Sequence, residues 1–340
     1  MNTNQQLSLY RHGQPDDEAI LLLRHYEPLA LEKDPRGFCV CTSEGKDSRV
    51  LGHLMRRAGV RHFYHHNITG IDPPELVYFQ RRTFREYEDM GFTCHDVLYR
   101  QSMWQLMLKK LVPPLRHMRY CCEHLKETRT EQQGESMITT GVRRAESVRR
   151  AKQRAEVEIW GRTVDSIEHM DPWKDIYDRD FIGPFDEDGE TQTVDNCYNN
   201  PNWKHTPGEW LDGLWIVNPI AEWPDHWVWD YSAEANLEQC SLYNEGFSRL
   251  GCIGCPMAGE AGRRREFERW PRFKDLYIRA FDEMIQRRRE RGMSVLFHGN
   301  NAGTDWFEWW LSDRAMEQPH DENQFVIDEF YEPPTVWQTE

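Results

Sequence analysis

The chain has 340 residues, 39% of them hydrophobic, and a formal net charge of −15. This length suits one large domain or two ordinary ones, and the acidity argues against a broadly basic nucleic-acid-binding surface. No stretch is apolar enough for a membrane span, residues 1–15 lack the apolar core of a signal peptide, and the nine cysteines form no disulfide-scaffold pattern. We therefore expect a reduced, cytoplasmic protein without a membrane segment.

Strand-like and helix-like patterns alternate after an N-terminal lead-in, residues 1–36, which contains one amphipathic segment at 18–31. Strands are predicted at residues 37–41, 62–67, 93–97, 136–140 and 214–217. Helices are predicted at residues 47–58, 75–90, 102–111, 144–155 and 225–235. The alternation predicts an α/β fold over residues 37–239, with a Rossmann-like parallel sheet and helices on both of its faces.

Two segments depart from this alternation. Residues 163–210 are acidic and rich in Asp, Asn, Pro and Gly, with Trp173, Trp203 and Trp210 scattered through them, and are interpreted as an insertion. Residues 240–340 show no further strand pattern and are interpreted as a helical C-terminal extension that carries cysteines. Helices are predicted there at 273–291 and 304–311, the second capped by Thr304.

A short polar turn joins the first predicted strand to the following helix. Its six residues are Ser43, Glu44, Gly45, Lys46, Asp47 and Ser48. Small residues before a helix let backbone N–H groups surround an anion, and the helix N-terminus favours negative charge. The spacing is not that of the Walker P-loop. The sequence predicts an anion-binding turn, and an ordinary polar turn capped by Ser43 or Asp47 is the alternative.

Two further strand ends carry candidate binding residues. The segment after the fourth strand contains Gly141, Arg143 and Arg144, and arginine suits the oxygens of phosphate or sulfate. Thr69 and Gly70 follow the second strand and are candidates for a nucleoside pocket. Surface arginines at a helix start and an ordinary loop are the respective alternatives. Because ligands bind at the carboxyl ends of parallel strands, we expect these loops to share one site.

Cysteines form a second candidate site. Cys252 and Cys255 have the C-x2-C spacing of metal or redox sites, and Cys240 and the adjacent Cys121 and Cys122 are candidates for the remaining ligands. Four thiolates bind either zinc or an iron–sulfur cluster, and the spacing does not separate the two. The same spacing is compatible with a redox-active dithiol or with inert buried thiols. The remaining cysteines, Cys39, Cys41, Cys94 and Cys197, are interpreted as ordinary buried residues.

Basic side chains gather in three local stretches despite the overall acidity. The first lies at residues 143–154, the second at 263–272, and the third is Arg287 to Arg289, interpreted as a solvated helix face. These stretches leave a nucleic acid as a candidate partner without establishing it.

Taken in order, these motifs resemble the phosphoadenosine phosphosulfate reductase family over roughly residues 37–257. The 43–48 turn resembles its PP-loop, usually Ser-Gly-Gly-x-Asp-Ser, with Glu44 in place of a glycine. The later motifs are Thr69-Gly70 with Pro74-Glu75, Cys121-Cys122, Gly141-x-Arg143-x-x-Glu146-Ser147, Asn218-Pro219-Ile220 with Trp223, Leu242-Tyr243 with Gly246-Phe247, and Gly251-Cys252-x-x-Cys255.

The resemblance implies an adenine-nucleotide α-hydrolase-like fold in which the 43–48 turn contacts nucleotide phosphates. It also implies that Cys121, Cys122, Cys252 and Cys255 hold a [4Fe–4S] cluster, with Cys240 able to replace one of the adjacent pair. The family's assimilatory reductases carry a catalytic cysteine near the C-terminus, whereas no cysteine follows Cys255 here. Related ATP pyrophosphatases that modify nucleic acids share the PP-loop.

The leading hypothesis is therefore an enzyme that cleaves ATP between its α and β phosphates, with Mg²⁺, and activates an acceptor for sulfur transfer. Lys46, Asp47, Arg143 and Arg144 are its candidate catalytic residues. A nucleic acid is a candidate acceptor, and a sulfur-donor or electron-donor protein is a candidate partner. The alternatives are a reductase of adenylyl or phosphoadenylyl sulfate, and a non-catalytic nucleotide-binding or metal-binding component of a larger assembly.

Overall fold

A computed structural model of the chain describes residues 14–160, 167–170, 213–293, 295 and 302–312. It consists of two compact units. The sheet unit comprises Met1–Tyr99 and Leu125–Gly251, and the helical unit comprises Arg100–His124 and Cys252–Glu340. The boundary predicted at residue 240 thus lies inside the sheet unit, and residues 100–124, assigned from the sequence to the α/β domain, belong to the helical unit.

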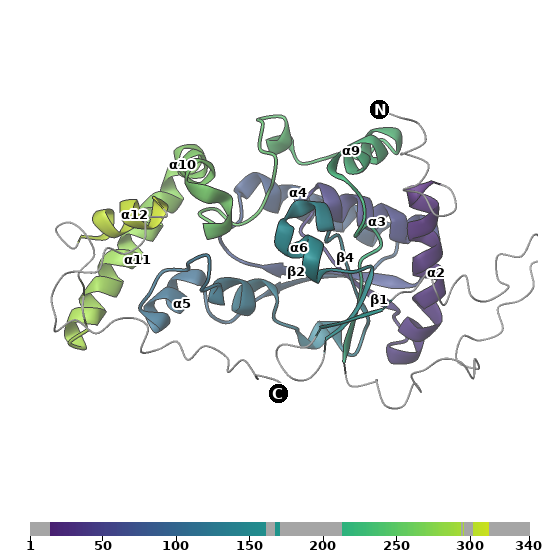
Figure 1. The fold of residues 1–340 in the computed structure, drawn as a ribbon, viewed down its shortest axis with the longest axis horizontal. Helices are drawn as coiled ribbons and strands as arrows, with labels where there is room; N and C mark the ends of the chain where they lie inside the picture. Colours follow the sequence, from purple (N-terminus) through teal and green to yellow (C-terminus); the bar gives the residue numbers. More distant parts are fainter. Residues whose placement is uncertain (1–13, 161–166, 171–212, 294, 296–301, 313–340) are drawn as a thin grey trace, which may run out of the picture. The chain divides into compact units, whose positions relative to one another are not determined.

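The sheet unit is built on seven strands within the described residues, in the order β3-β2-β1-β4-β7-β5-β6. Figure 1 labels β1, β2 and β4 of this sheet. The five predicted strands are all present. They are β1 (Phe38–Cys41), β2 (His62–Ile68), β3 (Cys94–Leu98), β4 (Ile138–Thr140) and β7 (Leu214–Val217). These five pair in parallel. The expected α/β fold class, with a helical C-terminal extension, is confirmed.

One edge of the sheet differs from the purely parallel prediction. Strands β5 (Val157–Trp160) and β6 (Ile167–Met170) were not predicted, and β5 pairs antiparallel with both β7 and β6. Strand β5 follows α6 (Val148–Gln153) along the chain. The predicted insertion at 163–210 includes β6, and its residues 171–210 lie outside the described residues.

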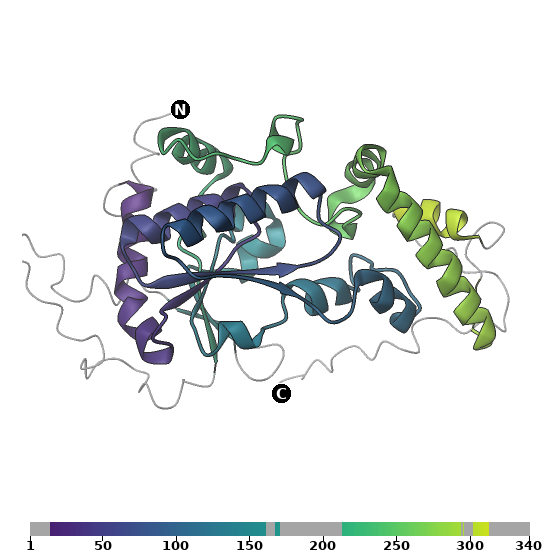
Figure 2. The same ribbon diagram turned by 180° about the vertical axis from the view of Figure 1, so that it is seen from behind.

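One face of the sheet carries the larger core. Phe38 and Val40 of β1 pack there with buried residues of four helices. These helices are α2 (Pro15–Lys33), α3 (Lys46–Ala58), α4 (Pro74–Asp89) and α9 (Asp225–Glu234). Figure 2 shows α3 and α4 running along this face of the strands. Because α2 buries six side chains, the described part of the lead-in predicted at residues 1–36 packs as a layer of the sheet unit.

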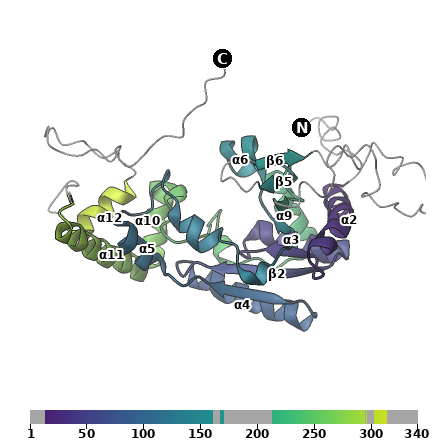
Figure 3. The ribbon, with the colours of Figure 1, turned by 90° about the horizontal axis from the view of Figure 1, so that it is seen from below.

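The helical unit consists of α5 (Met103–Lys110), α10 (Gly259–Arg269), α11 (Pro271–Glu290) and α12 (Gly303–Leu311), all visible in Figure 3. Its core is aromatic: Tyr277 and Trp310 stack at 4.9 Å between ring centroids, and Phe267 meets the edge of Tyr277 at 5.4 Å. Buried Arg263 donates hydrogen bonds to the carbonyls of Trp310 and Leu311, at 2.8 and 2.9 Å, which ties α10 to the end of α12.

The helix boundaries agree with the sequence with three exceptions. Helix α10 was not predicted. The helix predicted at 144–155 divides into a 3₁₀ turn, Arg144–Glu146, and α6. Thr304 does not cap α12, because the helix begins at Gly303 with Ala302 as its N-cap. The Gly303 N–H donates to Asp282 Oδ1 of α11 at 2.6 Å. Among the described helices, none combines the length and the apolar character that crossing a membrane requires.

Candidate functional site

The predicted binding loops meet at one edge of the sheet. Strands β2, β1, β4 and β7 are parallel neighbours, so their carboxyl ends lie along the same edge. The chain leaves β1 toward β2 on one side, while β4 pairs on the other side of β1, which makes the β1–β4 boundary the topological switch point of the sheet. Ligands of open α/β sheets bind at such a point.

The 43–48 turn occupies the end of β1. The Ser48 hydroxyl links the two ends of this turn. It accepts a hydrogen bond from the Ser43 N–H at 3.3 Å, and its oxygen also lies 3.3 Å from the Ser43 hydroxyl oxygen. Gly45 is the N-cap of α3, and neither Ser43 nor Asp47 fills that position. The N–H groups of Asp47 and Ser48 lie in the first helical turn and have no intrahelical acceptor, which makes them available to an anion.

Glu44 has an anchoring role within this turn. Its φ of +51° lies in the left-handed region, where the resembling motif usually has glycine. The side chain is only 1% exposed and is held by Thr42 Oγ1, which donates at 2.7 Å, and by Arg49 Nη1 at 3.4 Å. Burial raises the pKa of Glu44, and Arg49 and Thr42 oppose that rise. Glu44 therefore points into the protein and leaves the outer side of the turn clear.

Two cations and two carboxylates surround the turn. Arg143 Nε donates to Asp47 Oδ1 at 2.6 Å, and its Nη2 donates to Asp225 Oδ1 at 2.7 Å. Lys46 Nζ lies 3.0 Å from Asp47 Oδ2 and 3.1 Å from Asp225 Oδ1. The Arg143 side chain is 2% exposed, whereas that of Asp225 is 64% exposed. Partial burial would raise the pKa of Asp225, but Lys46 and Arg143 together lower it.

Gly141 brings the β4 loop against the turn. A Cβ atom at this position would lie 3.0 Å from both the carbonyl carbon and the carbonyl oxygen of Asp47, and 3.2 Å from the Ser48 nitrogen. These are backbone atoms, which cannot give way cheaply. A larger residue would therefore force the end of β4 and the start of α3 apart by a few tenths of an ångström.

Arg144 is not brought into this cluster. Its guanidinium is 43% exposed, pairs with Glu222 at 2.7 Å, and donates to the Ala151 carbonyl. Thr69 and Gly70 do lie at the same sheet edge, after β2, where the Thr69 hydroxyl donates to Asp72 Oδ2 at 2.6 Å. On β2 itself, His66 Nδ1 lies 2.8 Å from the Thr42 carbonyl oxygen and links that strand to the 43–48 turn.

Asp225 and Tyr243 are site residues that sequence reasoning missed. Asp225 resembles an ordinary acidic residue in the first turn of a helix, here α9. The Tyr243 hydroxyl accepts the Lys46 N–H at 2.9 Å, and burial raises the pKa of Tyr243 above its usual range. Tyr243 belongs to one of the motifs quoted above, which was the one available signal. Its contact with Lys46 spans 197 residues of sequence.

The cysteines separate into two groups. Cys121, Cys122, Cys252 and Cys255 all belong to the helical unit. The hydrogen bond with Cys122 raises the pKa of Cys121, burial raises it further, and Cys252 and Cys255 add to the rise, so the four thiols are neighbours. Cys240 lies instead in the sheet unit, where burial raises its pKa and Glu75 and Glu245 are its acidic neighbours.

The chemistry of this donor set suits a thiolate-bound metal centre. Arg119 Nη2 lies 3.2 Å from Cys122 Sγ and supplies a positive charge beside the thiols. Within the described residues, no three His, Cys, Asp or Glu side chains approach closely enough to hold a single metal ion.

Comparisons with known proteins connect this site to a family. A family model described as the phosphoadenosine phosphosulfate reductase domain matches residues 37–258. An adenosine 5′-phosphosulfate reductase of Allochromatium vinosum is 33% identical over 64 residues, which are 18% of this chain and 25% of that protein. The corresponding protein of Neisseria meningitidis serogroup B is 36% identical over 58 residues, 17% of this chain and 24% of the relative. The matches span about a quarter of these curated relatives.

Two other similarities extend the comparison. An uncharacterized 37.8 kDa protein of Escherichia phage 186 is 26% identical over 97 residues, 28% of each chain. The crystal structure of phosphoadenylyl-sulfate reductase from Candida auris aligns with a TM-score of 0.41 and 14% identity, covering 73% of this chain and 91% of that one. The family match covers more than half of this chain and includes all four strand-end loops of the site, and the chain therefore belongs to the phosphoadenosine phosphosulfate reductase family.

Proposed function

We propose that the chain binds ATP at the 43–48 turn and cleaves it between the α and β phosphates to activate an acceptor for sulfur transfer. The observation that carries this proposal is the convergence of Lys46 and Arg143 on the same two carboxylates, Asp47 and Asp225, at the β1–β4 switch point. Both cations are largely buried, so their attraction for phosphate is screened less than that of surface cations.

The two carboxylates neutralise these cations while no nucleotide is bound. An entering triphosphate takes over Lys46 and Arg143 and receives hydrogen bonds from the free N–H groups of Asp47 and Ser48. Asp47 and Asp225 would then be released to hold Mg²⁺, a hard cation that prefers carboxylate and phosphate oxygens and would neutralise charge on the phosphates.

The reaction that this arrangement suits is adenylyl transfer. The acceptor oxygen attacks the α-phosphorus, a new O–P bond forms, and the α–β phosphoanhydride bond breaks to release pyrophosphate. A sulfur nucleophile supplied by a donor protein then displaces AMP from the activated acceptor. Arg143 stabilises the charge that develops on the transferring phosphate, because its guanidinium is already positioned and requires no reorganisation.

Reduction of a sulfonucleotide is the second candidate, favoured by the similarity to two adenosine 5′-phosphosulfate reductases. It needs a thiolate to attack sulfur. Residues 256–340 contain no cysteine, and the thiols of the helical unit are the proposed metal ligands. A non-catalytic nucleotide-binding component of a larger assembly is the third candidate.

The thiols Cys121, Cys122, Cys252 and Cys255 are proposed to hold a [4Fe–4S] cluster, with zinc as the alternative metal. Cys240 has neighbours of its own in the sheet unit, which favours the four-cysteine set without it. Such a centre would support the structure or orient the substrate rather than transfer electrons, because residues 256–340 contain no cysteine that could act as its partner nucleophile.

The test uses a matched pair of variants, Arg143→Leu and Arg144→Leu. Full-length protein is incubated with ATP, Mg²⁺ and nucleic-acid acceptors, and AMP and pyrophosphate are quantified. Binding of a non-hydrolysable ATP analogue is measured in parallel by calorimetry. Arg143→Leu should lose at least tenfold in analogue affinity, as expected for one charge-assisted contact of about 1.5–3 kcal/mol, whereas Arg144→Leu should bind like the unmodified protein.

Three outcomes would contradict the proposal. Equal effects of the two variants would remove the assigned role of Arg143. Sulfite release from adenylyl sulfate with thioredoxin, without pyrophosphate release from ATP, would establish the reductase. Tight ATP binding without AMP formation under every acceptor condition would favour the non-catalytic alternative.

A further inference from the structure

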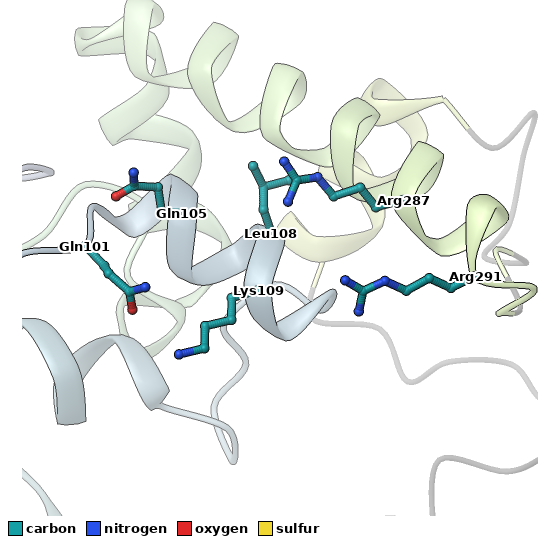
Figure 4. A pocket seen from close by; sticks show the side chains of 6 residues that line it. All are labelled: Gln101, Gln105, Leu108, Lys109, Arg287 and Arg291. Atoms are coloured by element: carbon teal, nitrogen blue, oxygen red, sulfur yellow. The ribbon is translucent and has the colours of Figure 1, made fainter.

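A groove in the helical unit lies between α5 and α11. It has a volume of about 480 Å³, and its lining residues are Gln101, Gln105, Leu108, Lys109, Arg287 and Arg291. Figure 4 shows the Arg287 side chain extending from α11 toward Leu108 of α5, with Arg291 just beyond the end of α11 and Lys109 on the α5 side. Three of the six lining residues are cationic, two are amides and none is acidic. This composition is unusual for a chain with a net charge of −15.

The two walls of this α5–α11 groove are held together by packing beneath it. Trp104 of α5 meets the ring of Tyr277 of α11 edge-on, with 5.0 Å between centroids. Arg288 Nη1 donates to the Leu111 carbonyl at the C-terminus of α5, at 2.8 Å. Because these contacts lie outside the lining, the groove keeps its shape without a ligand, and little ordering is needed when one binds.

The lining cations are open to solvent. Lys109 and Arg291 are exposed, and the part of the chain that the structure describes contains no ion-pair partner for either of them. Arg287 pairs with Glu283, one turn earlier on the surface of α11, at 2.6 Å, and an exposed pair of this kind is weak. The Gln105 amide oxygen accepts the Ser102 N–H at 2.8 Å, which leaves its amino group as a further donor.

Helix dipoles alone do not explain this arrangement. Cations in a last helical turn stabilise the helix that carries them, which accounts for Lys109 on α5 and Arg287 on α11 separately. The dipole effect does not explain why the lysine of one wall and the two arginines of the other line the same groove together with two glutamines. A ligand with several negative charges spaced along its length does account for it.

We propose that the α5–α11 groove binds the phosphodiester backbone of a nucleic-acid strand. Arginine grips phosphate oxygens in bidentate fashion, lysine adds a point charge, and glutamine side chains bond to phosphate and sugar oxygens. This binding is independent of the proposed ATP reaction, because every lining residue belongs to the helical unit. It would nevertheless identify the class of acceptor that the enzyme holds.

The charge count sets the expected salt dependence. Three cations that neutralise three phosphates give a slope of log K against log salt of roughly −2 for a single strand. Affinity should then fall roughly 16-fold between 50 and 200 mM salt. A broadly basic surface would give a steeper slope.

The experiment measures binding of full-length protein to a labelled 20-nucleotide single strand and to the matching duplex by fluorescence anisotropy. Each measurement is repeated with polyglutamate as a competitor. The groove variant is Lys109→Glu with Arg291→Glu. The matched control is Lys110→Glu with Arg289→Glu, which makes the same charge change at exposed positions of the same two segments outside the lining. Far-UV circular dichroism verifies that both variants are folded.

The groove variant should lose at least tenfold in affinity and most of the salt slope, while the control stays within about threefold of the unmodified protein. Equal losses in the two variants would overturn the proposal, since they would report net charge alone. Absence of binding to either oligonucleotide at 50 mM salt would also overturn it. Full displacement by an equal charge concentration of polyglutamate would assign the groove to acidic polypeptides instead.

Discussion

Replacing Glu44 by alanine is expected to lower the free energy of unfolding by about 3 kcal/mol. Glu44 is 1% exposed and Arg49 is 7% exposed, so removing the carboxylate leaves a buried guanidinium without its charged partner. Breaking a buried ion pair costs about 3–5 kcal/mol. The lower end applies because Arg49 keeps a hydrogen bond to the Tyr87 hydroxyl at 2.9 Å and one to the Glu238 carbonyl at 3.2 Å.

A glycine at the same position separates the ion pair from the backbone strain. Glu44 has a φ of +51°, a conformation that costs an L-residue about 1–2 kcal/mol. Glycine avoids this cost but adds about 0.4–1 kcal/mol of conformational entropy to the unfolded chain. Glu44→Gly should therefore be about 1 kcal/mol more stable than Glu44→Ala, although both lose the pair with Arg49.

The assay is urea-induced unfolding followed by far-UV circular dichroism, with amide hydrogen exchange of residues 38–41 to assign the change to the sheet unit. Glu260→Ala, which removes an exposed pair with Arg264 in the helical unit, is the control and should change stability by less than about 0.5 kcal/mol. An alanine variant of Glu44 as stable as that control would refute the energetic role of the pair. A glycine variant less stable than the alanine variant would refute the strain argument.

Three further predictions follow from single positions. Gly141→Ala should cost about 1–3 kcal/mol and weaken ATP binding, because its Cβ would press on the backbone of Asp47; urea unfolding and calorimetry measure both. Burial lowers the pKa of His62 from 6.5 to about 4. The unfolded state therefore binds a proton first, and His62 should contribute a loss of stability of about 3 kcal/mol as pH falls from 6.5 to 4. His62→Gln should remove this contribution in unfolding curves at each pH and leave that of His65, whose pKa burial also lowers to about 4. Cys252→Ser should lose iron from anaerobically purified protein, whereas Cys240→Ser should retain it, as measured by absorption spectrum and metal analysis.

Each of these has a matched control or a contradicting result. Gly262→Ala in α10, where a Cβ would make an ordinary 3.5 Å contact, should stabilise slightly, and a similar gain at Gly141 would contradict the close approach. His226→Gln, at an exposed histidine, should leave the pH dependence unchanged. Iron retained in Cys252→Ser, or colourless and metal-free protein before any substitution, would exclude the cluster at these thiols.

The sequence predicted the central strands because their signal is local. In β1, Phe38 and Val40 point to one core and Cys39 to the other, which appears in the sequence as alternation over a few residues. The apolar spacing of α3 is equally local. The antiparallel β5–β6 edge depends on pairing with β7, which lies more than fifty residues further along the chain, and no short pattern encodes that.

The site was predictable in its loops but not in its contacts. Adjacent Arg143 and Arg144 are indistinguishable by type, and only the direction of the chain leaving β4 sends one to Asp47 and the other to Glu222. Asp225 pairs with Arg143 across 82 residues. Sequence spacing gives no information on a contact of that range, which depends on the strand order of the folded sheet.

The division of the chain has a consequence for synthesis. Residues 100–124 belong to the helical unit, yet the whole of 125–251 must be made before the remainder of that unit begins at Cys252. At about 5–20 residues per second, this separates the two parts by on the order of ten seconds. During that interval the apolar face of α5, with Met103, Leu106 and Met107, has none of the helices α10–α12 to cover it. A nascent chain arrested near residue 251 should therefore attract chaperones at α5 although all residues of its sheet unit have been synthesised.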